Sequence, residues 1–552
     1  MGKWFKSGSP WIWMTGGAVS LSLIAVLGLL LLIAWRGLSY FWPADIYQWE
    51  MLDQNGEKST LIGEIYDREE VPTERLISAG HKFNEHPGEF VTRYLVKTGN
   101  REFVGLDFRW IYETNIVSRS VPEDVAKFER TKNGNFYGYP IAVIEDGKRL
   151  NLEGEALEVK LGEQIARAVA ITDEALTLQK SDIGAINYSL ERLRLKERKF
   201  ELNGNLTPER KSEIDGQVKA LNDDYLVLEK QLFAMRDDAA RDSVIIRDMR
   251  GEEVTLRLDT VIDVSYVNHM SLLGKVSHWF VGLGRFVSDD PREANTEGGV
   301  FPAIFGTVFM VMLMAVIVTP FGVIAAIYLH EYAKKGPITK MIRIAVINLA
   351  GVPSIVYGVF GLGFFVYMLG GSIDQLFYPE ALPSPTFGSP GVIWSALTLA
   401  ILTLPVVIVS TEEGLSRIPS SVRQGSLALG ATKAETLWRI VIPMASPAIM
   451  TGLILAVARA AGEVAPLMLV GVVKLAPTLP IDMNFPFVHL ERKFMHLGFH
   501  IYDVGFQSPN VEAARPLVYA TSFLLVSVIV TLNLTAISVR NHLREKFRSL
   551  EH

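Results

Sequence analysis

Six long apolar runs constrain the fold of this chain more than any other feature of its sequence. The runs cover residues 11–42, 300–329, 344–369, 391–411, 444–472 and 516–538. A membrane-spanning helix rises about 1.5 Å per residue and needs about 20 predominantly apolar residues, so each run is long enough to cross a bilayer. We therefore predict an α-helical membrane protein with six transmembrane helices.

The composition indicates that the chain contains more than membrane helices. Of its 552 residues, 21% are charged, and the mean hydropathy is +0.23. A membrane part together with a sizeable polar domain accounts for these values. Cysteine is absent, which excludes disulfides, thiolate metal sites and a cysteine nucleophile. The formal net charge of −6 is small for this length and gives no reason to expect nucleic-acid binding.

The first apolar run, 11–42, follows a short N-terminal segment, 1–10, that carries Lys3 and Lys6 and no acidic residue. Tryptophans lie near both ends of the run, where they suit the two membrane interfaces. A cleavable signal peptide is the rival interpretation, but the run is long and no A-x-A-like site follows it. We expect an uncleaved first transmembrane helix with its N-terminus in the cytoplasm.

Residues 43–298 contain no apolar run long enough to span, so we expect them to form one domain on the far side of the membrane. Short strand-like runs separated by turn residues predict β structure over about 55–160 and again over about 243–268. Examples are 89–96 and 108–112.

Between these β-rich parts, at about 162–241, the apolar period changes to a heptad. The seam of the second arm consists of Ile214, Val218, Leu221, Tyr225, Leu228, Leu232 and Met235. Asn203-Gly204-Asn205 breaks the helix, and Thr207-Pro208 restarts it with proline at the first position. We predict an antiparallel coiled-coil hairpin, roughly 40 Å long, inserted into the α+β domain. Its role is either that of a rigid spacer or that of a docking arm, because heptads establish only helix pairing.

The charges of the short loops orient the membrane helices. Lysine and arginine collect in 333–343, in 412–443 and in the tail, 541–552, whereas 370–390 contains acidic residues and no lysine or arginine. Positively charged loops favour the cytoplasmic side. We therefore predict that both termini and the loop 412–443 are cytoplasmic and that the large domain is periplasmic.

The longest cytoplasmic loop has the pattern of two short helices joined at a glycine. Pro419 can open the first helix, since the first helical position needs no N–H, and Gly430 can close it in the left-handed conformation. Thr432 and Glu435 form a capping box for the second helix. Pro443 is expected to end that helix. A helical elbow of this kind can pass motion between a membrane domain and a soluble partner.

The spacing of Gly430, nine further residues and then Ile440-Val441-Ile442-Pro443 resembles the coupling loop of ABC importer permeases. That family's motif reads E-A-A-x3-G-x9-I-x-L-P. Gln424-Gly425-Ser426 stands where the motif opens, so the glutamate and both alanines are absent here. The resemblance implies contact with an ATPase through Gln424, Gly430, Thr432, Glu435, Ile440 and Pro443.

Two further stretches resemble signatures of phosphate importer permeases of the PstA type. They are G-V-P-S-I-V-Y-G at 351–358 and A-R-A-A-G-E-V-A-P-L at 458–467. The family usually reads R-A-x-G-E-T-A-P-L at the second stretch, and Val464 replaces the threonine. The resemblance covers about 300–540 and implies a type I ABC importer permease fold for 299–540. The long external domain is not part of the common short form.

Arg459 and Glu463 are ionisable residues inside the fifth apolar run, four residues apart. A charge at mid-membrane costs at least about 2.5–3.5 kcal/mol, so such residues are rarely without a role. One interpretation is a structural ion pair on one helix. The other is a substrate pathway in which Arg459 contacts phosphate, because a guanidinium matches phosphate oxygens, and Glu463 neutralises it when the site is empty.

The sequence contains no motif for catalysis or for ATP binding. The G-x4-G-K-[ST], H-E-x-x-H, G-x-S-x-G and EF-hand patterns do not occur. We therefore expect a transport subunit without a catalytic residue, metal or cofactor of its own.

The resemblance implies the permease subunit of a bacterial phosphate ABC importer in the inner membrane, which works by alternating access. Its partners would be a second permease subunit, two ATP-binding subunits, a periplasmic phosphate-binding protein and the lipid bilayer. Two alternatives remain: a permease for another oxyanion, such as molybdate or sulfate, and a membrane-anchored sensor or scaffold that works through its periplasmic coiled coil.

Overall fold

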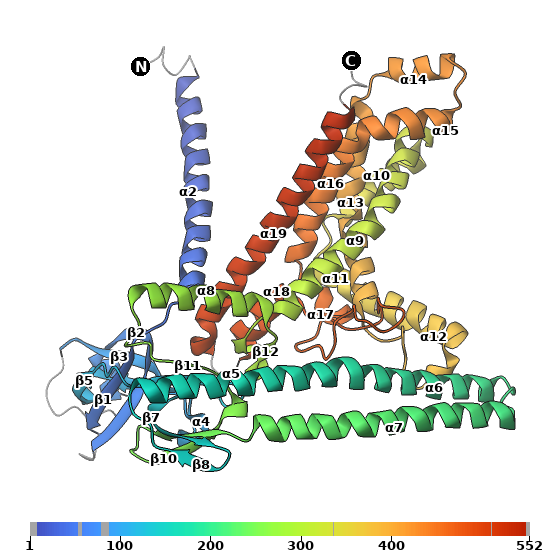
Figure 1. Ribbon diagram of the computed structural model, residues 1–552. Coiled ribbons are helices and arrows are strands. Elements are labelled where there is room, and N and C mark those ends of the chain that lie inside the picture. The colour runs from blue at the N-terminus through green and yellow to red at the C-terminus, as the bar shows by residue number, and fades with distance from the viewer. Residues whose placement is uncertain (1–7, 53–57, 79–87, 335, 509–510, 548–552) are drawn as a thin grey trace. The chain divides into compact units, whose positions relative to one another are not determined.

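The protein is described by a computed structural model that covers residues 8–52, 58–78, 88–334, 336–508 and 511–547 (Figure 1). The chain divides into two compact units. The first combines Met1–Tyr40 with Val300–His552, and the second is Phe41–Gly299.

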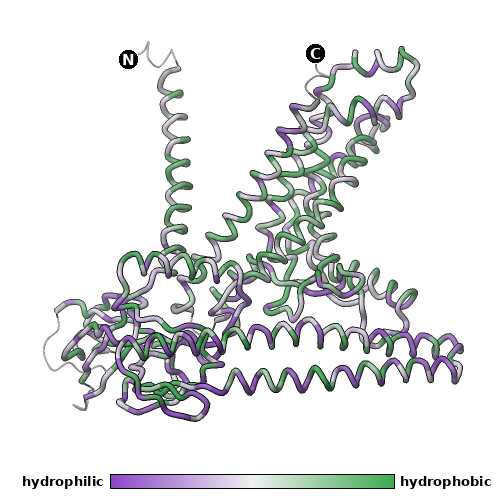
Figure 2. The backbone as a smooth tube through the Cα atoms, viewed as in Figure 1, coloured by the Kyte–Doolittle hydropathy of each residue, from purple (hydrophilic) through white to green (hydrophobic). Residues whose placement is uncertain are grey.

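The first unit is helical, and its long helices are apolar along most of their length (Figure 2). In the described part of the chain, six helices are long and apolar enough to cross a membrane, which confirms the predicted number. They are Trp11–Ser39, Phe301–Tyr332, Ser354–Phe377, Val392–Arg417, Lys433–Gly462 and Ala514–His542. The main elements within them are α2 (Ser9–Ser39), α9 (Phe301–Ile327), α11 (Ser354–Phe360), α13 (Val392–Arg417), α16 (Ile442–Gly462) and α19 (Val511–Phe547).

Small residues allow α13 and α16 to approach closely at the centre of this unit. A Cβ atom added to Gly414 would lie 2.4 Å from the Cβ of Ala448, and one added to Gly452 would lie 2.7 Å from the Cβ of Ser410. The Ser410 hydroxyl donates a hydrogen bond of 2.7 Å to the carbonyl of Ala448. Lipid tails are as apolar as leucine, so close packing and hydrogen bonds of this kind hold membrane helices together.

The third span begins later than predicted. The sequence placed it at 344–369, but the helix α10 (Pro337–Leu349) ends first, and the spanning helix runs over Ser354–Phe377. Pro353 is the N-cap of α11 with φ −57° and ψ 136°, an extended conformation. The apolar run continues through this break, so hydropathy alone did not reveal it.

The described residues of the second unit form two larger antiparallel sheets (Figure 1) and a two-stranded sheet of β12 (Pro291–Arg292) and β13 (Glu297–Gly298). The first sheet has the strand order β4-β3-β2-β1-β5. Its strands are β1 (Ile46–Leu52), β2 (Lys58–Pro72), β3 (Phe90–Lys97), β4 (Phe108–Tyr112) and β5 (Ile116–Ser120). Its buried core includes Trp49, Ile62, Val96 and Ile111.

The second sheet has the order β10-β9-β7-β6-β11, with β8 paired to β7. Its strands are β6 (Ala126–Arg130), β7 (Phe136–Glu145), β8 (Lys148–Leu150), β9 (Ser243–Arg247), β10 (Glu253–Arg257) and β11 (Val261–Ser265). Strands from before and after the helical arms pair directly, since Val143 of β7 faces Val244 of β9. The arms are therefore an insertion into this one sheet.

The inserted arms are long helices joined at a tight turn. The first arm consists of α5 (Glu155–Leu178), a π-helical turn (Gln179–Ile183) and α6 (Gly184–Leu202), and the second is α7 (Pro208–Ala239). Pro208 lies at the start of α7, as predicted, and the Thr207 side chain caps the helix. The two arms share an apolar cluster that comprises Ala175, Leu178, Ile183, Tyr225, Leu228, Leu232 and Met235. Regular coiled-coil packing along the whole hairpin stays a prediction.

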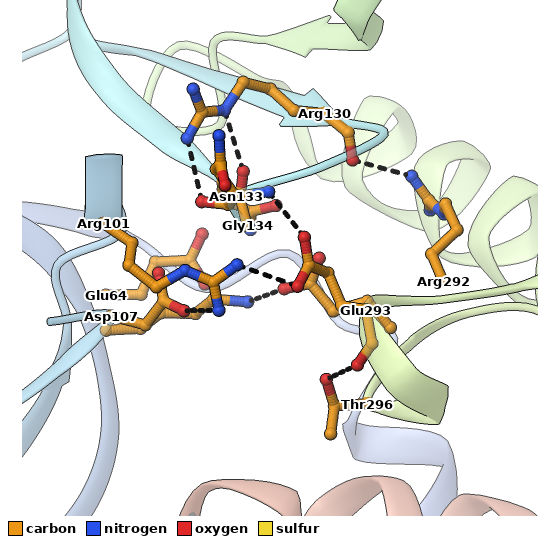
Figure 3. Close-up of polar contacts among 12 residues, drawn as sticks. Glu64, Arg101, Asp107, Arg130, Asn133, Gly134, Arg292, Glu293 and Thr296 are labelled. Carbon is orange, nitrogen blue, oxygen red and sulfur yellow. Dashed lines mark hydrogen bonds and ion pairs between the residues drawn. The ribbon is translucent and has the colours of Figure 1, made fainter. Parts of the chain in front are cut away.

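The segment 289–299, here called the strap, follows the amphipathic helix α8 (Leu272–Ser288) and leads to α9. It carries the short strands β12 (Pro291–Arg292) and β13 (Glu297–Gly298). A polar network fastens the strap to the rest of the second unit (Figure 3). Arg101 pairs with Glu293 at 2.8 Å, and Arg292 donates to the carbonyl of Arg130 at 3.1 Å. The segment that precedes α9 is thus held by ion pairs and hydrogen bonds.

Candidate coupling elbow and transport pathway

The loop after α13 forms the predicted helical elbow. It consists of α14 (Ser420–Ala428), the turn at Gly430 and α15 (Lys433–Thr436). Gly430 has φ +91°, in the left-handed region where a Cβ is disfavoured. The capping box is confirmed: the Thr432 hydroxyl accepts from the Glu435 N–H at 3.2 Å, and the Glu435 carboxylate accepts from the Thr432 N–H at 2.9 Å. Pro419 is the N-cap of α14, one position before the place predicted for it.

Pro443 does not end the helix that begins at the elbow, which corrects the sequence prediction. The π-helical turn Leu437–Val441 precedes it, and one continuous helical segment extends over Lys433–Gly462. Proline lacks an N–H and clashes with the carbonyl four residues back in a regular α-helix. The wider π-helical turn directly before Pro443 alters this local spacing, so the helix continues through the proline. The fifth span therefore runs from 433 to 462 instead of 444–472.

The elbow presents exposed side chains on its outer surface and a small polar contact inside. Gln424 is exposed, and the hydroxyls of Ser426 and Thr436 lie 2.9 Å apart in a buried contact between α14 and α15. Leu429 is 91% exposed and Trp438 is 71% exposed. These two apolar residues were not singled out from the sequence.

An ion pair fastens the elbow to the π-helical turn Tyr328–Tyr332, which continues the end of α9. We call Glu331, Arg423 and Lys433 the elbow anchor. The Nε atom of Arg423 donates to a carboxylate oxygen of Glu331 at 3.0 Å. The same guanidinium donates to the carbonyls of Leu415 and Ile418, each at 2.8 Å, at the end of α13. Lys433 donates to the carbonyl of Glu331. One arginine thus joins α14 to both α9 and α13.

Glu331 was missed by sequence analysis. The signal available was an acidic residue beside a loop in which lysine and arginine dominate. Its carboxylate is only 11% exposed. A carboxylate with so little access to water requires a charged or hydrogen-bonding partner, and Arg423 supplies both.

Arg459 and Glu463 lie at the far end of the helix that starts in the elbow. The Nε atom of Arg459 is 3.5 Å from a carboxylate oxygen of Glu463. The two residues do not share one helix as predicted, because α16 ends at Gly462 and Glu463 adopts an extended conformation with φ −82° and ψ 127°. The pair forms across the helix end, and its side chains are 34% and 22% exposed.

The two signature stretches that lie far apart in the sequence pack against each other. A Cβ atom added to Gly358, in the first stretch, would lie 2.7 Å from the Cα of Pro466 in the second. The short helix α17 (Leu467–Val470) begins directly after Pro466. A larger residue at position 358 would push away the turn that follows the Arg459–Glu463 pair. Sequence analysis identified both stretches but not their contact.

A polar cluster orders the loop between α17 and α18 (Leu497–Tyr502), outside the membrane-spanning helices. A carboxylate oxygen of Asp482 lies 2.6 Å from Nη1 of Arg492, and the other lies 2.9 Å from Nε2 of His489. Burial alone would raise the pKa of Asp482, but hydrogen bonds from Arg492, the Asn484 backbone and His489 lower it to about 2. This cluster was not predicted.

Two histidines near the start of α18, His496 and His500, are buried. Burial lowers the pKa of both His496 and His500 to about 4, so both are neutral near pH 7. The Asp503 carboxylate opposes this effect at His500, and Lys474, which pairs with Asp503 at 3.0 Å, reinforces it. Both neutral imidazoles are part of the buried interior of the first unit.

The membrane part of the chain matches a known protein family and several known proteins. The family described as binding-protein-dependent transport system inner membrane component matches residues 318–549. Phosphate transport system permease protein PstA 1 of Mycobacterium tuberculosis is 35% identical over 245 residues, which is 44% of this chain and 71% of the relative. The probable ABC transporter permease YqgI of Bacillus subtilis is 29% identical over 251 residues, 45% of this chain and 79% of the relative.

An archaeal relative gives the same result over a shorter stretch. The probable phosphate transport system permease PstA of Methanocaldococcus jannaschii is 31% identical over 191 residues, 34% of this chain and 60% of the relative. The family consists of membrane components, and ATP is hydrolysed by separate subunits. The chain therefore belongs to the PstA-type ABC permeases, as a multi-pass inner-membrane component with no catalytic site of its own.

Proposed function

We propose that this chain is the membrane-spanning permease subunit of an ATP-driven importer of inorganic phosphate. Support for the substrate comes from the relatives, several of which are named phosphate transport permeases. Support for the mechanism comes from the geometry between the elbow and the Arg459–Glu463 pair.

The observation that carries this proposal is the continuous helical segment Lys433–Gly462. It starts in the elbow and ends one residue before Glu463, after 30 residues or about 45 Å. A displacement of the elbow by an ATPase is transmitted along this helix to Arg459. Alternating access then follows if the displacement tilts α16 together with α13, which packs closely against it.

The exposed part of the elbow is the surface that we assign to the ATPase. Leu429 and Trp438 offer apolar contacts, and Gln424 stands where the related motif has its glutamate. Exposed apolar groups within a polar surround are typical of a protein contact. The remaining coupling residues Gly430, Thr432, Glu435, Ile440 and Pro443 shape this surface. One such ATPase on this chain and one on a second permease complete the complex.

We assign Arg459 to the substrate pathway. A guanidinium offers several N–H donors in a plane that matches phosphate oxygens, and Glu463 supplies a countercharge while the site is empty. The Arg459 Nε atom and the Glu463 carboxylate are 3.5 Å apart, which is longer than a tight hydrogen bond. The two side chains can therefore separate without the loss of such a bond. Phosphate would compete with Glu463 for Arg459, so the pair would act as a gate.

The charges of the short loops favour one orientation of the chain across the membrane. The lysines and arginines of 333–343, 412–443 and 541–552 favour the cytoplasm for the elbow and for both termini. The unit Phe41–Gly299 then lies in the periplasm, on the side from which a phosphate-binding protein delivers its ligand. The helical hairpin would serve there as a spacer or as a docking arm.

The decisive experiment is affinity purification of the tagged chain from mild detergent, followed by reconstitution of the copurified complex in liposomes. The proposal requires an ATPase and a second permease in the eluate, and ATP-dependent uptake of labelled phosphate in the presence of a binding protein. Uptake of molybdate or sulfate instead would identify a different oxyanion. A chain that purifies without an ATPase and loses a signalling output when 163–241 is deleted would be a sensor or scaffold.

A further inference from the structure

The helix α8 carries its apolar residues on the outside. Five of its large apolar side chains are exposed, here called the apolar face of α8: Leu272, Leu273, Phe280, Val281 and Val287. Leu273 is 82% exposed and Phe280 is 62% exposed. Along α8, every residue of which the structure describes, the two charged residues Lys275 and Arg285 are partly buried. A helix of a water-soluble domain shows the opposite arrangement.

The charged residues of α8 point toward its own domain. Lys275 pairs with Asp45 at 2.6 Å, and its side chain is only 18% exposed. Arg285 pairs with Asp263 at 2.9 Å, on the strand β11. The helix is therefore fastened through its polar side, which leaves the apolar face directed away from the domain.

Chain connectivity places α8 close to a bilayer. The first candidate span ends at Ser39, and Phe41, two residues later, packs against Phe286 of α8 with ring centres 5.1 Å apart and ring planes at 55°. Two residues of extended chain reach at most about 7 Å, so Phe41 follows closely on the end of the first candidate span. Asp45, the partner of Lys275, is only four residues further along.

We propose that α8 lies in the membrane–water interface and inserts its apolar face into the boundary between headgroups and acyl chains. Interfacial helices have a large apolar face, a polar face and aromatic residues at headgroup depth. Trp279, beside Phe280 with ring centres 4.8 Å apart, meets the last condition. The exposed side offers no cation, so the contact is with lipid chains and does not depend on anionic headgroups. Lipid is the occupant that the attachment at Phe41 favours over a soluble partner.

The test uses the natural absence of cysteine from the chain. Single-cysteine variants Leu273→Cys, Phe280→Cys and Val287→Cys, seven residues apart on the apolar face, receive a nitroxide label in the full-length protein in lipid nanodiscs. Collision with molecular oxygen, which concentrates in lipid, is compared with collision with a water-soluble nickel chelate. Val117→Cys, at an exposed apolar position on β5, is the matched control.

The proposal expects oxygen to exceed the nickel chelate in collision rate at all three positions of α8 and the reverse at Val117. The result is expected to be the same in phosphatidylcholine alone and with added phosphatidylglycerol. Nickel collision at the three positions equal to that at Val117 would place the face in water and overturn the proposal. Protection from both reagents would also overturn it, because the face would then be covered by protein. A requirement for phosphatidylglycerol would refute the insertion through apolar contacts.

Discussion

Arg423 and Glu331 are joined by a hydrogen bond of 3.0 Å between the guanidinium Nε and the carboxylate, although 92 residues separate them in the chain. The bond fastens the first helix of the elbow to the end of α9. Arg423 also donates to carbonyls at the end of α13, so one side chain fastens α14 to two other helical segments. We regard this pair as the point that gives the elbow a defined geometry.

Replacement of Glu331 by glutamine is expected to loosen the elbow. Hydrogen bonds to charged groups contribute about 1.5–3 kcal/mol, so amide exchange in 420–436 should accelerate by about tenfold or more. Hydrogen-exchange mass spectrometry measures this change, and ATP-coupled phosphate uptake should fall with it. Glu413→Gln, at an exposed position of α13, is the matched control and should leave both unchanged. Equal exchange in the two variants would contradict a role for the anchor.

Gly430→Val is expected to abolish ATP-coupled uptake while membrane insertion stays intact. The left-handed conformation at this position, φ +91°, costs a residue with a Cβ about 1–2 kcal/mol, and more for a β-branched one. The turn between the elbow helices would change its path. Uptake in proteoliposomes and the amount of inserted protein are the two measurements.

Gly425→Ala is the matched control for this glycine. It lies inside α14, and a Cβ there meets no atom within 4 Å. Alanine favours a helix over glycine by about 1 kcal/mol, so the variant should transport normally with a slightly more stable elbow. If Gly430→Val transported as well as Gly425→Ala, the elbow would not be the coupling element.

Arg459→Gln is expected to reduce phosphate uptake strongly with little effect on stability. The pair with Glu463 is partly exposed and 3.5 Å long, and pairs of this kind contribute about 0–1 kcal/mol. The melting temperature in detergent should therefore stay close to that of the unmodified protein. Arg459→Lys retains the charge without the planar donors and should transport at an intermediate rate. If Arg459→Gln combined with Glu463→Gln restored uptake, the pair would be purely structural.

Acidification is expected to destabilise the first unit through His496 and His500. Their folded-state pKa of about 4 lies below the ordinary value of 6.5, so the unfolded chain binds protons more readily. Their contribution is complete above pH 6.5 and is lost as the pH falls from 6.5 to about 4. Each residue accounts for at most about 3 kcal/mol.

Melting temperatures between pH 7.5 and 5 measure this effect. The double variant His496→Asn with His500→Asn should show a shallower decline over this range. His542→Asn, at an exposed position of α19, is the control and should keep the original slope. An unchanged slope in the double variant would show that other groups cause the acid sensitivity.

The sequence by itself determined the features that depend on neighbouring residues. Six apolar runs are visible because a helix that faces lipid needs continuous apolar composition. The capping box at Thr432 and Glu435 and the left-handed Gly430 are equally local, since each follows from side chains within one helical turn. The start of α7 after Thr207 was predictable for the same reason.

The tertiary structure decided which of these local elements meet. The contact of Gly358 with Pro466 and the pair of Glu331 with Arg423 join segments about 100 residues apart, and neither leaves a periodic signal in the sequence. The helix continues through Pro443 because of the π-helical turn Leu437–Val441, and no sequence pattern in those residues predicts such a turn. The pairing of β7 with β9, on either side of the inserted hairpin, joins strands about 100 residues apart into one sheet. Such contacts are selected by packing and charge between distant segments, so only the folded chain reveals them.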